Sequence, residues 1–521
     1  MNTTPTISGC ACCGLSRRQF LASGCATCAG ALGVLASPRI AFAAAAGAKP
    51  AIRIIYSLHA ETQPGPDWPN VGFAFKPVMD KINAALAGAC PEFEFLPTLA
   101  TGPEEAEAIV KQDASGSILG YIVYQMNCWN RVVQTVAETG KPTLYVDFQF
   151  GGSGGFLVYT ADFLRKQTPN LGFAATSRLE DVIAAVKCFK PIADGAAPAD
   201  FALATAQVRR QSTPAPGDLT CLPDPVKTVS PEECMMRMRA SKILLVKDQE
   251  SKELDPYLGI PLLQIPFSEL NAAWESADKD EAAAVADRWM QRASAIQDVP
   301  RETLEVSAAM YLAQKALLSK YEANAITINC LGGFYGGHIH AYPCLGFHEL
   351  GNDGLIGACE ADVRSTATMV TFNALTQGRP GYISDPVMDT AKRQIIYAHC
   401  VASNRPFGPS GAENPFSILT HSEDRQGAAV RSELPVGYMT TSIEVSPERK
   451  EFLFHQAKAV ANDPDDRACR TKLCAEPVGD IEKLFTQWDQ WNWHRVTCYG
   501  DLREPVFALA DALGCKVVEE A

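Results

Sequence analysis

The side chains best suited to chemistry gather in residues 357–366, GACEADVRST, where two carboxylates and an arginine fall within five positions. The run before them is apolar and glycine-rich, so the charge lies where the chain enters its interior. A helix N-terminus with acidic first-turn residues is one explanation, because carboxylates stabilise the positive end of the helix dipole. A metal or acid/base site is the other. In a strand, alternation would point Glu360 and Asp362 to one side, so both carboxylates could reach one cation.

Histidines form a second group with possible chemistry. Three of the eight, His338, His340 and His348, lie within eleven positions, and Glu349 follows them directly. Asparagine, aspartate and glycine dominate the link to Glu360, so we expect a loop–strand–loop here. A His-x-His pair on a strand places both rings on one face, which suits a metal. Solvated loop histidines are the alternative explanation.

Strands that alternate with helices must position these groups. In the N-terminal part, short apolar runs predict strands at 51–56, 93–96, 118–124 and 143–148, with helices at 75–86 and 104–111. This alternation predicts a parallel sheet with helices on both faces. Residues 151–155, GGSGG, predict a flexible loop at the carboxyl end of a strand, where such folds bind ligands. The lysine and hydroxyl residue of a phosphate-binding P-loop do not follow it.

A second alternating pattern and then a β-rich region follow. We expect strands at 241–247, 259–265 and 325–329, with helices at 278–295 and 301–321. After a helix at 366–375, short strands at 381–384, 394–398, 436–443 and 495–499 are separated by glycines and prolines, as in an antiparallel unit or barrel. The fold class predicted is therefore α/β: two Rossmann-like, doubly wound domains followed by a mixed α+β C-terminal domain with a barrel-like antiparallel unit.

Domain boundaries follow from these patterns, since 521 residues are too many for one compact core. We expect an N-terminal α/β domain at 44–190 and a Pro/Ala-rich connecting segment at 191–230. A second α/β domain is expected at 231–365. A β-rich domain at 366–521 would complete the site.

Residues 1–43 have the layout of an export signal. A twin-arginine pattern, SRRQFL at 16–21, precedes an Ala/Gly-rich apolar stretch and a small-x-small cleavage site at 41–43. This order predicts export through the Tat machinery to the periplasm or beyond. No later stretch approaches 18 apolar residues, so we expect the mature chain not to span a membrane.

Charge and cysteine usage narrow the class of protein. The formal net charge is −13 and no basic stripe occurs, which argues against a nucleic-acid partner. Of 18 cysteines, five lie in the signal, and the other thirteen are an odd number without CxxC spacing. That pattern is not a disulfide framework. Most are expected to be buried thiols, with Cys469 and Cys474 as a possible local pair.

Several segments resemble the C-terminal half of the L-fucose isomerase-like proteins, relatives of L-arabinose isomerase. They are 344–346 (CLG), 352–362 (NDGLIGACEAD), 395–400 (IIYAHC) and 492–501 (NWHRVTCYGD). In such proteins an acidic CExD segment is followed by a helix, a strand ending in His-Cys, and a late histidine before YGD. The resemblance covers roughly residues 320–521, and the N-terminal regions fit in architecture alone.

This resemblance implies an aldose–ketose isomerase that uses a divalent metal, commonly Mn²⁺. The metal would hold O1 and O2 of a small sugar and stabilise an enediolate while a carboxylate moves a proton between C1 and C2. By the same resemblance, Asp362 is a metal ligand and acid/base group, and His494 is the late imidazole ligand. Glu360 either ligates the metal or tunes Asp362. A homo-oligomer that shares active sites between subunits is also implied.

One position departs from the family pattern. The family places a catalytic glutamate shortly after a strand ending in cysteine, but here Gly333 stands in its place. His338, His340 or Glu349 could supply the missing group. Loss of a proton-transfer partner commonly costs roughly 10²–10⁴-fold in rate. A catalytically degenerate carbohydrate-binding protein that keeps the fold is therefore the alternative, and a metal-dependent hydrolase on the same ligands is a third option.

Other residues are candidates for substrate binding. His399, Arg364 and His340 are predicted to bind the substrate, His399 by lining the pocket. His399 could equally satisfy a backbone carbonyl, and Arg364 could be the ion-pair partner of Asp362 or Glu360. Three tryptophans within six residues, at 488, 491 and 493, could form a platform for the apolar face of a sugar or could be packing residues.

Overall fold

The computed structural model describes residues 49–521, so the expected export signal in 1–43 lies outside the described residues. The predicted N-terminal parallel sheet is confirmed, with strand order β2-β1-β3-β4-β5 and every pair parallel. Its strands are β1 (Ala51–Ser57), β2 (Glu94–Ala100), β3 (Ile118–Gln125), β4 (Thr143–Asp147) and β5 (Leu171–Ala174). Strand β3 is buried along its whole length, as expected for a parallel strand covered on both faces.

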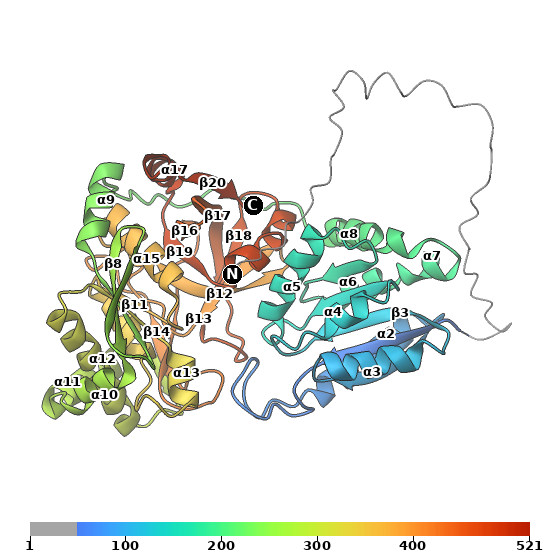
Figure 1. Ribbon diagram of the computed structural model, residues 1–521, viewed down its shortest axis with the longest axis horizontal. Helices are drawn as coiled ribbons and strands as arrows, with labels where there is room; N and C mark the ends of the chain where they lie inside the picture. Colours follow the sequence, from blue (N-terminus) through green and yellow to red (C-terminus); the bar gives the residue numbers. More distant parts are fainter. Residues whose placement is uncertain (1–48) are drawn as a thin grey trace, which may run out of the picture. The chain divides into compact units, whose positions relative to one another are not determined.

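Helices cover both faces of this first sheet (Figure 1). They are α2 (Lys76–Ala89), α3 (Pro103–Asp113), α4 (Val132–Ala137), α5 (Ser153–Arg165), α6 (Leu179–Val186) and α7 (Phe189–Ala193). Alternation along β1 divides its side chains, since Ile54 packs with α2 and α6 while Ile55 packs with α4 and α5. The sheet is therefore doubly wound.

The expected flexible loop at residues 151–155 is wrong. Helix α5 begins at Ser153, and Gly152, Gly154 and Gly155 are buried. A Cβ on Gly152 would lie 2.0 Å from the carbonyl oxygen of Gln125, and one on Gly154 would lie 2.7 Å from the Trp493 ring. These glycines serve close packing rather than chain flexibility.

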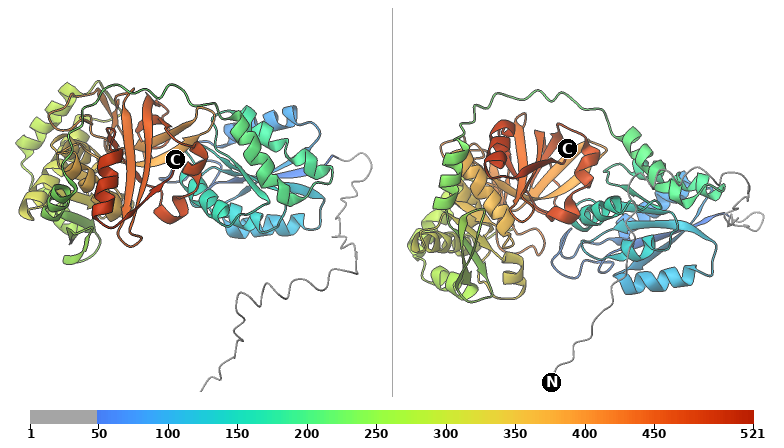
Figure 2. Two further views of the ribbon diagram at one scale, coloured as in Figure 1. Left: turned by 90° about the horizontal axis from the view of Figure 1, so that it is seen from above. Right: turned by 45° about the horizontal axis from the view of Figure 1, so that its top comes forward.

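The chain between the first and second sheets is partly helical. The expected connecting segment contains α8 (Phe201–Ser212), and a second helix, α9 (Pro231–Ala240), follows it. Residues 213–230 form no helix or strand, and Figure 2 shows this green stretch extended between α8 and α9.

A second, mostly parallel sheet follows in the order β11-β10-β6-β8-β7. Its strands are β6 (Ile243–Lys247), β7 (Lys252–Tyr257), β8 (Ile260–Pro266), β10 (Ala325–Ile328) and β11 (Ile356–Ala358), of which β7 alone is antiparallel to its neighbour. Its helices include α10 (Phe267–Glu275), α11 (Lys279–Arg292), α12 (Arg301–Lys320), α13 (Cys330–Tyr335), α14 (Cys344–Asn352) and α15 (Val363–Leu375).

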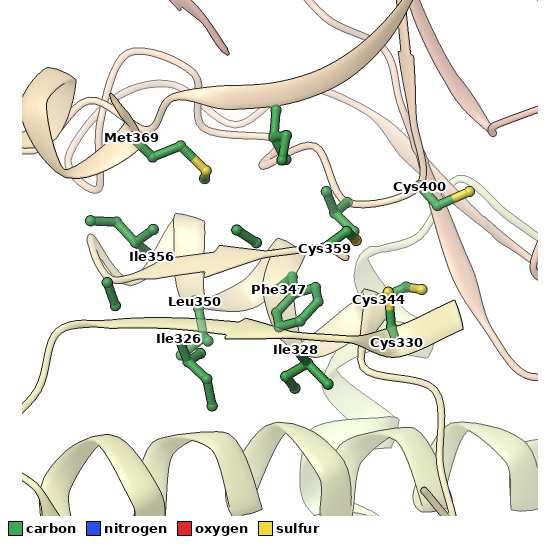
Figure 3. Packing of buried hydrophobic residues seen from close by; sticks show 14 of the residues in the cluster. Ile326, Ile328, Cys330, Cys344, Phe347, Leu350, Ile356, Cys359, Met369 and Cys400 are labelled. Atoms are coloured by element: carbon green, nitrogen blue, oxygen red, sulfur yellow. The ribbon is translucent and has the colours of Figure 1, made fainter. Parts of the chain in front are cut away.

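The core beside β10 and β11 supports the turn that carries Glu360. Figure 3 shows Ile326 and Ile328 of β10 near Phe347 and Leu350 of α14. A Cβ on Gly357 would lie 2.5 Å from the Phe347 ring, so this glycine lets α14 pack directly on β11. Dense packing of this kind fixes the end of β11.

The C-terminal region contains a closed, six-stranded antiparallel barrel, as the short strands predicted. The strand order is β16-β19-β12-β13-β18-β17, and pairing of β16 with β17 closes it. The strands are β12 (Tyr382–Asp389), β13 (Gln394–His399), β16 (Met439–Ser446), β17 (Glu451–Asn462), β18 (Thr471–Pro477) and β19 (Arg495–Tyr499). Strand β20 (Lys516–Glu519) adds to β17 in parallel, and α17 (Arg503–Ala512) precedes it.

A third, small sheet joins two parts of the chain that are far apart in sequence. Strand β9 (Ala295–Gln297) pairs in parallel with β14 (Phe416–Leu419), and β15 (Ala429–Ser432) pairs antiparallel with β14. Segments from the expected second and third domains therefore share this sheet.

All thirteen cysteines in residues 49–521 are free thiols, so the possible Cys469–Cys474 pair does not form. Among the same residues, no helix is both long and apolar enough to cross a membrane.

A buried ionic group lies inside the barrel. The Glu520 carboxylate accepts hydrogen bonds from Arg495 at 2.9 Å through both oxygens, and His455 Nδ1 lies 2.8 Å from it. Burial raises the pKa of Glu520, but Arg495 and His455 outweigh it and lower the pKa from 4.5 to about 2. Because the folded pKa is depressed, this stabilisation is present above the unfolded value and is lost as pH falls.

We expect Glu520→Gln to lower the free energy of unfolding by about 3–5 kcal/mol at pH 7, since it leaves Arg495 buried and unpaired. Stability of the wild type should fall between about pH 5 and pH 2, and that part of the pH dependence should shrink in the variant. Urea unfolding across this range measures both. Glu519→Gln is the matched control, because its pair with Arg503 is 44% and 46% exposed and should be worth under about 1 kcal/mol. Equal losses in both variants would contradict the account.

Candidate active site

Residues 359–362, which include Glu360 and Asp362, form a turn rather than a strand. Strand β11 ends at Ala358, and Glu360 and Ala361 take positive φ angles of 64° and 53°. Asp362 then caps α15, accepting a hydrogen bond from the Ser365 amide at 3.0 Å. The expected strand alternation of Glu360 and Asp362 is therefore wrong. Two consecutive non-glycine residues in the left-handed region cost of order 1–3 kcal/mol each, and such strain persists mainly at functional sites.

Four side chains converge at this turn. Glu360, Asp385, His399 and His494 each offer one ligand atom, and these atoms all lie within 4.8 Å of one another. Glu360 follows β11, Asp385 lies in β12, His399 ends β13 and His494 directly precedes β19. The barrel thus contributes three of the groups, and the second α/β sheet contributes the fourth.

Asp362 is not one of these four residues, but it contacts one of them, His494. Its Oδ2 atom lies 2.8 Å from Nδ1 of His494 and accepts a hydrogen bond from the Ser365 hydroxyl at 2.8 Å. Burial raises the pKa of Asp362, but the bonds from His494 and Ser365 outweigh it and lower the pKa to about 2. Asp362 is therefore a fixed carboxylate that orients the imidazole and directs its Nε2 toward the other acids.

Nε2 of His494 faces two carboxylates, at 3.0 Å from Asp385 Oδ1 and 3.5 Å from Glu360 Oε2. Burial opposes the charged imidazole, yet these acids outweigh it and raise the pKa of His494 well above its usual range. Burial is also the main cause that raises the pKa of Glu360 to about 8. The cluster thus has a surplus of negative charge that a cation would relieve.

The polar atoms of the cluster fit a divalent metal. The Cys400 amide donates to Nδ1 of His399 at 2.9 Å, so the neutral ring carries its proton on Nε2, which faces the cluster as a donor. That Nε2 is buried and without a hydrogen bond, and the buried Asp385 Oδ1 faces Nε2 of His494 at 3.0 Å. Burial lowers the pKa of His399 and keeps its imidazole neutral, so the Nε2 proton can be donated to a bound oxygen atom. The carboxylates of Glu360 and Asp385 and the imidazole of His494, whose Nδ1 is paired with Asp362, form a mixed oxygen and nitrogen set that is typical of first-row divalent ions.

A cavity of about 520 Å³ opens onto this cluster. Its lining residues are Trp129, Val158, Glu360, Ala361, Asp362, Val363, Trp488, Asp489, Asn492, Trp493 and His494. Trp129 is 49% exposed, and its ring meets Trp493 edge-on at 6.0 Å between centroids. Trp493 is held from behind by Gly154 of α5 and by a hydrogen bond to the Pro386 carbonyl at 3.1 Å. The lining of the cavity therefore combines three acidic residues with three tryptophans.

Some predicted site residues lie elsewhere. His340 is half-exposed, and its Nδ1 is 3.7 Å from Glu275 of α10. His338 stacks on Phe267 at 5.8 Å. The expected loop–strand–loop between them and Glu360 contains helix α14, in which His348 is buried, before the short strand β11.

Arg364 follows the capping turn at the start of α15. Its guanidinium lies 5.8 Å from the Trp491 ring, and two of its nitrogens are buried without a hydrogen bond. It is not among the residues that line the cavity.

Gly333, which stands where the family has a glutamate, is buried in α13. A Cβ there would lie 2.9 Å from Cδ1 of Ile339, so a larger side chain would have to displace that residue. The four-residue cluster contains no group from this position.

The sequence analysis did not single out Asp385. The signal available was an acidic residue in the otherwise apolar run YISDPVM, where a buried carboxylate needs a partner. His399 was expected to bind substrate, and the structure brings its Nε2 donor into the four-residue cluster.

The chain is similar to sulfoquinovose isomerases. It is 24% identical to the enzyme of Clostridium sp. (strain MSTE9) over 268 residues, which are 50% of this chain and 58% of that protein. It is 26% identical over 206 residues to the enzymes of Priestia aryabhattai and Priestia megaterium (strain ATCC 12872 / QMB1551), covering 38% of this chain and 44% of theirs. No family model matches the chain. The alignments thus span about half the length of these relatives and support a sugar isomerase.

Proposed function

We propose that this protein is a metal-dependent aldose–ketose isomerase. The observation that carries the proposal is the convergence of Glu360, Asp385, His399 and His494 beside a cavity of sugar size. Similarity to sulfoquinovose isomerases supports the reaction class. We further propose Mn²⁺ as the metal, export by the Tat route, and a homo-oligomeric assembly, each on the resemblance or the leader pattern of the sequence.

Each residue of the cluster has a separate part in the proposed reaction. A bound divalent cation supplies polarisation of the sugar carbonyl and hydroxyl oxygens. Glu360 has a side chain 33% exposed and lines the cavity. It is therefore placed to carry a proton between C1 and C2. Asp362 and Ser365 hold the ring of His494 in position, as outer carboxylates do for metal-binding histidines.

The cavity favours an uncharged sugar. Its lining carboxylates are Glu360, Asp362 and Asp489, the His494 imidazole faces the first two of these acids, and no lysine or arginine is among the lining residues. Sulfoquinovose, the sugar in the relatives' name, carries a sulfonate, and an anion of that kind is usually met by arginine or lysine. We therefore propose a neutral aldose or ketose as the substrate.

The test is ketose formation from a panel of neutral aldoses and from sulfoquinovose. Protein stripped with a chelator should be inactive, and added Mn²⁺ should restore turnover of at least one neutral sugar. Restored activity on sulfoquinovose alone would refute the substrate proposal and leave the reaction class standing.

A catalytically degenerate sugar-binding protein is the second candidate, and Gly333 is the observation that favours it. In that case the metal-loaded protein would bind a sugar without exchanging its C2 proton with solvent. Isomerase activity would exclude this candidate.

Trp129 gives a prediction about substrate binding. Because its ring is exposed at the cavity, we expect Trp129→Ala to raise KM about 3–10-fold with little change in kcat, through loss of one stacking face of order 1 kcal/mol. Steady-state kinetics measures this. Trp274→Ala is the matched control, since Trp274 lies on α10 beside His340. Unchanged KM in Trp129→Ala would show that the ring does not contact the sugar.

A further inference from the structure

A second cavity lies at the ends of the small sheet, and its residues have no part in the proposed reaction. Its volume is about 510 Å³. Strands β9 and β14 are parallel and both end at it. The lining residues are Gln297, Asp298, Leu419, Thr420, Arg425, Asp466 and Arg470. Ligands commonly bind beyond the carboxyl ends of parallel strands, which is where this cavity lies.

Three arginines converge on one carboxylate here. Asp466 lies 2.6 Å from Nη1 of Arg470, 2.8 Å from Nη1 of Arg425 and 3.9 Å from Nη2 of Arg431. Burial lowers the pKa of Arg425 and of Arg431, and the nearby charge of Arg470 lowers both further. The three guanidinium groups therefore repel one another and need an anion between them.

The arginines are held in place by the protein. Arg470 is 1% exposed, and its Nε and Nη2 donate to the carbonyl and hydroxyl of Thr420 at 2.8 and 3.1 Å. Arg425 takes a positive φ of 61° in the turn after β14. Arg431 donates through Nε to the Arg470 carbonyl at 3.1 Å, while its buried Nη2 has no hydrogen bond. A rigid set of donors with one unused is a preorganised anion site.

Asp466 is also held through its backbone carbonyl, which accepts hydrogen bonds from Arg425 at 3.2 Å and from Arg470 at 3.3 Å. Its side chain is 65% exposed and lies in the loop between β17 and β18. The neighbouring Asp465 is engaged by Arg467 at 2.7 Å, so it does not neutralise the three arginines directly. An exposed carboxylate can be displaced by an external oxyanion with more oxygens, which would also reach Nη2 of Arg431.

We propose that Arg425, Arg431 and Arg470 form a binding site for a tetrahedral oxyanion of the phosphate type, with the Asp466 carboxylate occupying it as an internal substitute. Free phosphate and the phosphate group of a monoester share this chemistry. The site stands independently of the isomerase proposal. Cys469, which precedes Arg470, lies near the four-residue cluster, since its sulfur is 3.9 Å from Asp385 Oδ2.

The test is calorimetric titration of the full chain with inorganic phosphate and, separately, with glycerol 1-phosphate at constant ionic strength. Asp466→Asn removes the internal competitor and should tighten phosphate binding at least fivefold relative to wild type. Adding Arg425→Gln to that variant should reverse the gain. Arg425 is chosen because it is partly exposed, so its loss should leave the fold intact. Arg503→Gln, which removes a surface arginine paired with Glu519, is the matched control and should leave binding unchanged.

The thermal midpoint provides a second measurement if binding is weak. Phosphate should raise the midpoint of Asp466→Asn more than that of wild type, and sodium chloride at equal ionic strength should not. Equal affinity for both probes would indicate free phosphate as a sufficient ligand, and tighter binding of the monoester would indicate a phosphorylated metabolite. No phosphate binding to Asp466→Asn, or binding that survives in the double variant, would overturn the proposal.

Discussion

Replacement of Asp385 by alanine is expected to abolish isomerase activity, with kcat/KM lower by roughly 10³-fold or more, because loss of a metal ligand removes several kcal/mol of transition-state stabilisation. Oδ1 of Asp385 lies 3.0 Å from Nε2 of His494, and its Oδ2 lies 3.9 Å from Nε2 of His399, so Asp385 faces both histidines of the cluster. The variant should also bind Mn²⁺ at least 10-fold more weakly. Metal titration and steady-state kinetics measure the two effects on the same protein.

Asp389→Asn is the matched control for this experiment. Asp389 is also a buried acid on β12, but it accepts from the backbone amides of Ser177 and Ala391 rather than facing the cluster. The Asp389→Asn variant should therefore bind Mn²⁺ with wild-type affinity. If Asp385→Ala retained wild-type metal affinity, Asp385 would not be a ligand.

The second large effect is expected from Glu360→Gln. This change keeps the shape of the side chain but removes its ability to accept a proton, so kcat should fall roughly 10²–10⁴-fold. Since Glu360 is also a potential metal ligand, the assay needs saturating Mn²⁺. Under that condition sugar binding, measured by equilibrium titration, should remain within a few fold of wild type.

Asp362→Asn separates proton transfer from positioning. Its carboxylate is fully engaged by His494 and Ser365, so its loss should mainly weaken metal binding. The opposite result, a variant with full metal affinity and no proton exchange, would identify Asp362 rather than Glu360 as the proton carrier.

The alternating apolar runs predicted both parallel sheets and the antiparallel barrel because burial on one or two faces leaves a clear period in sequence. Where packing between distant segments decides the conformation, prediction failed. The glycines of residues 151–155 read as a loop, but Gln125 and Trp493 press against them in a helix. The local sequence pattern does not show which distant residues will pack against a segment.

In the candidate site, too, some residues were predicted from the sequence and others were missed. Glu360 and His494 were predicted from motifs close to a family pattern, and both join the cluster. Asp385 was missed because its partners come from other strands, which pair only in the folded barrel. The turn at Glu360 was mistaken for a strand since its positive φ angles involve no glycine.

The most direct test of the central claim is proton NMR of metal-loaded wild type with its best neutral sugar in D₂O. We predict loss of the C2 proton signal of the aldose together with appearance of the ketose, both dependent on Mn²⁺ and both lost in Glu360→Gln. A protein that binds Mn²⁺ and sugar yet leaves C2 unexchanged, with no ketose formed, would contradict the isomerase assignment and leave the sugar-binding alternative.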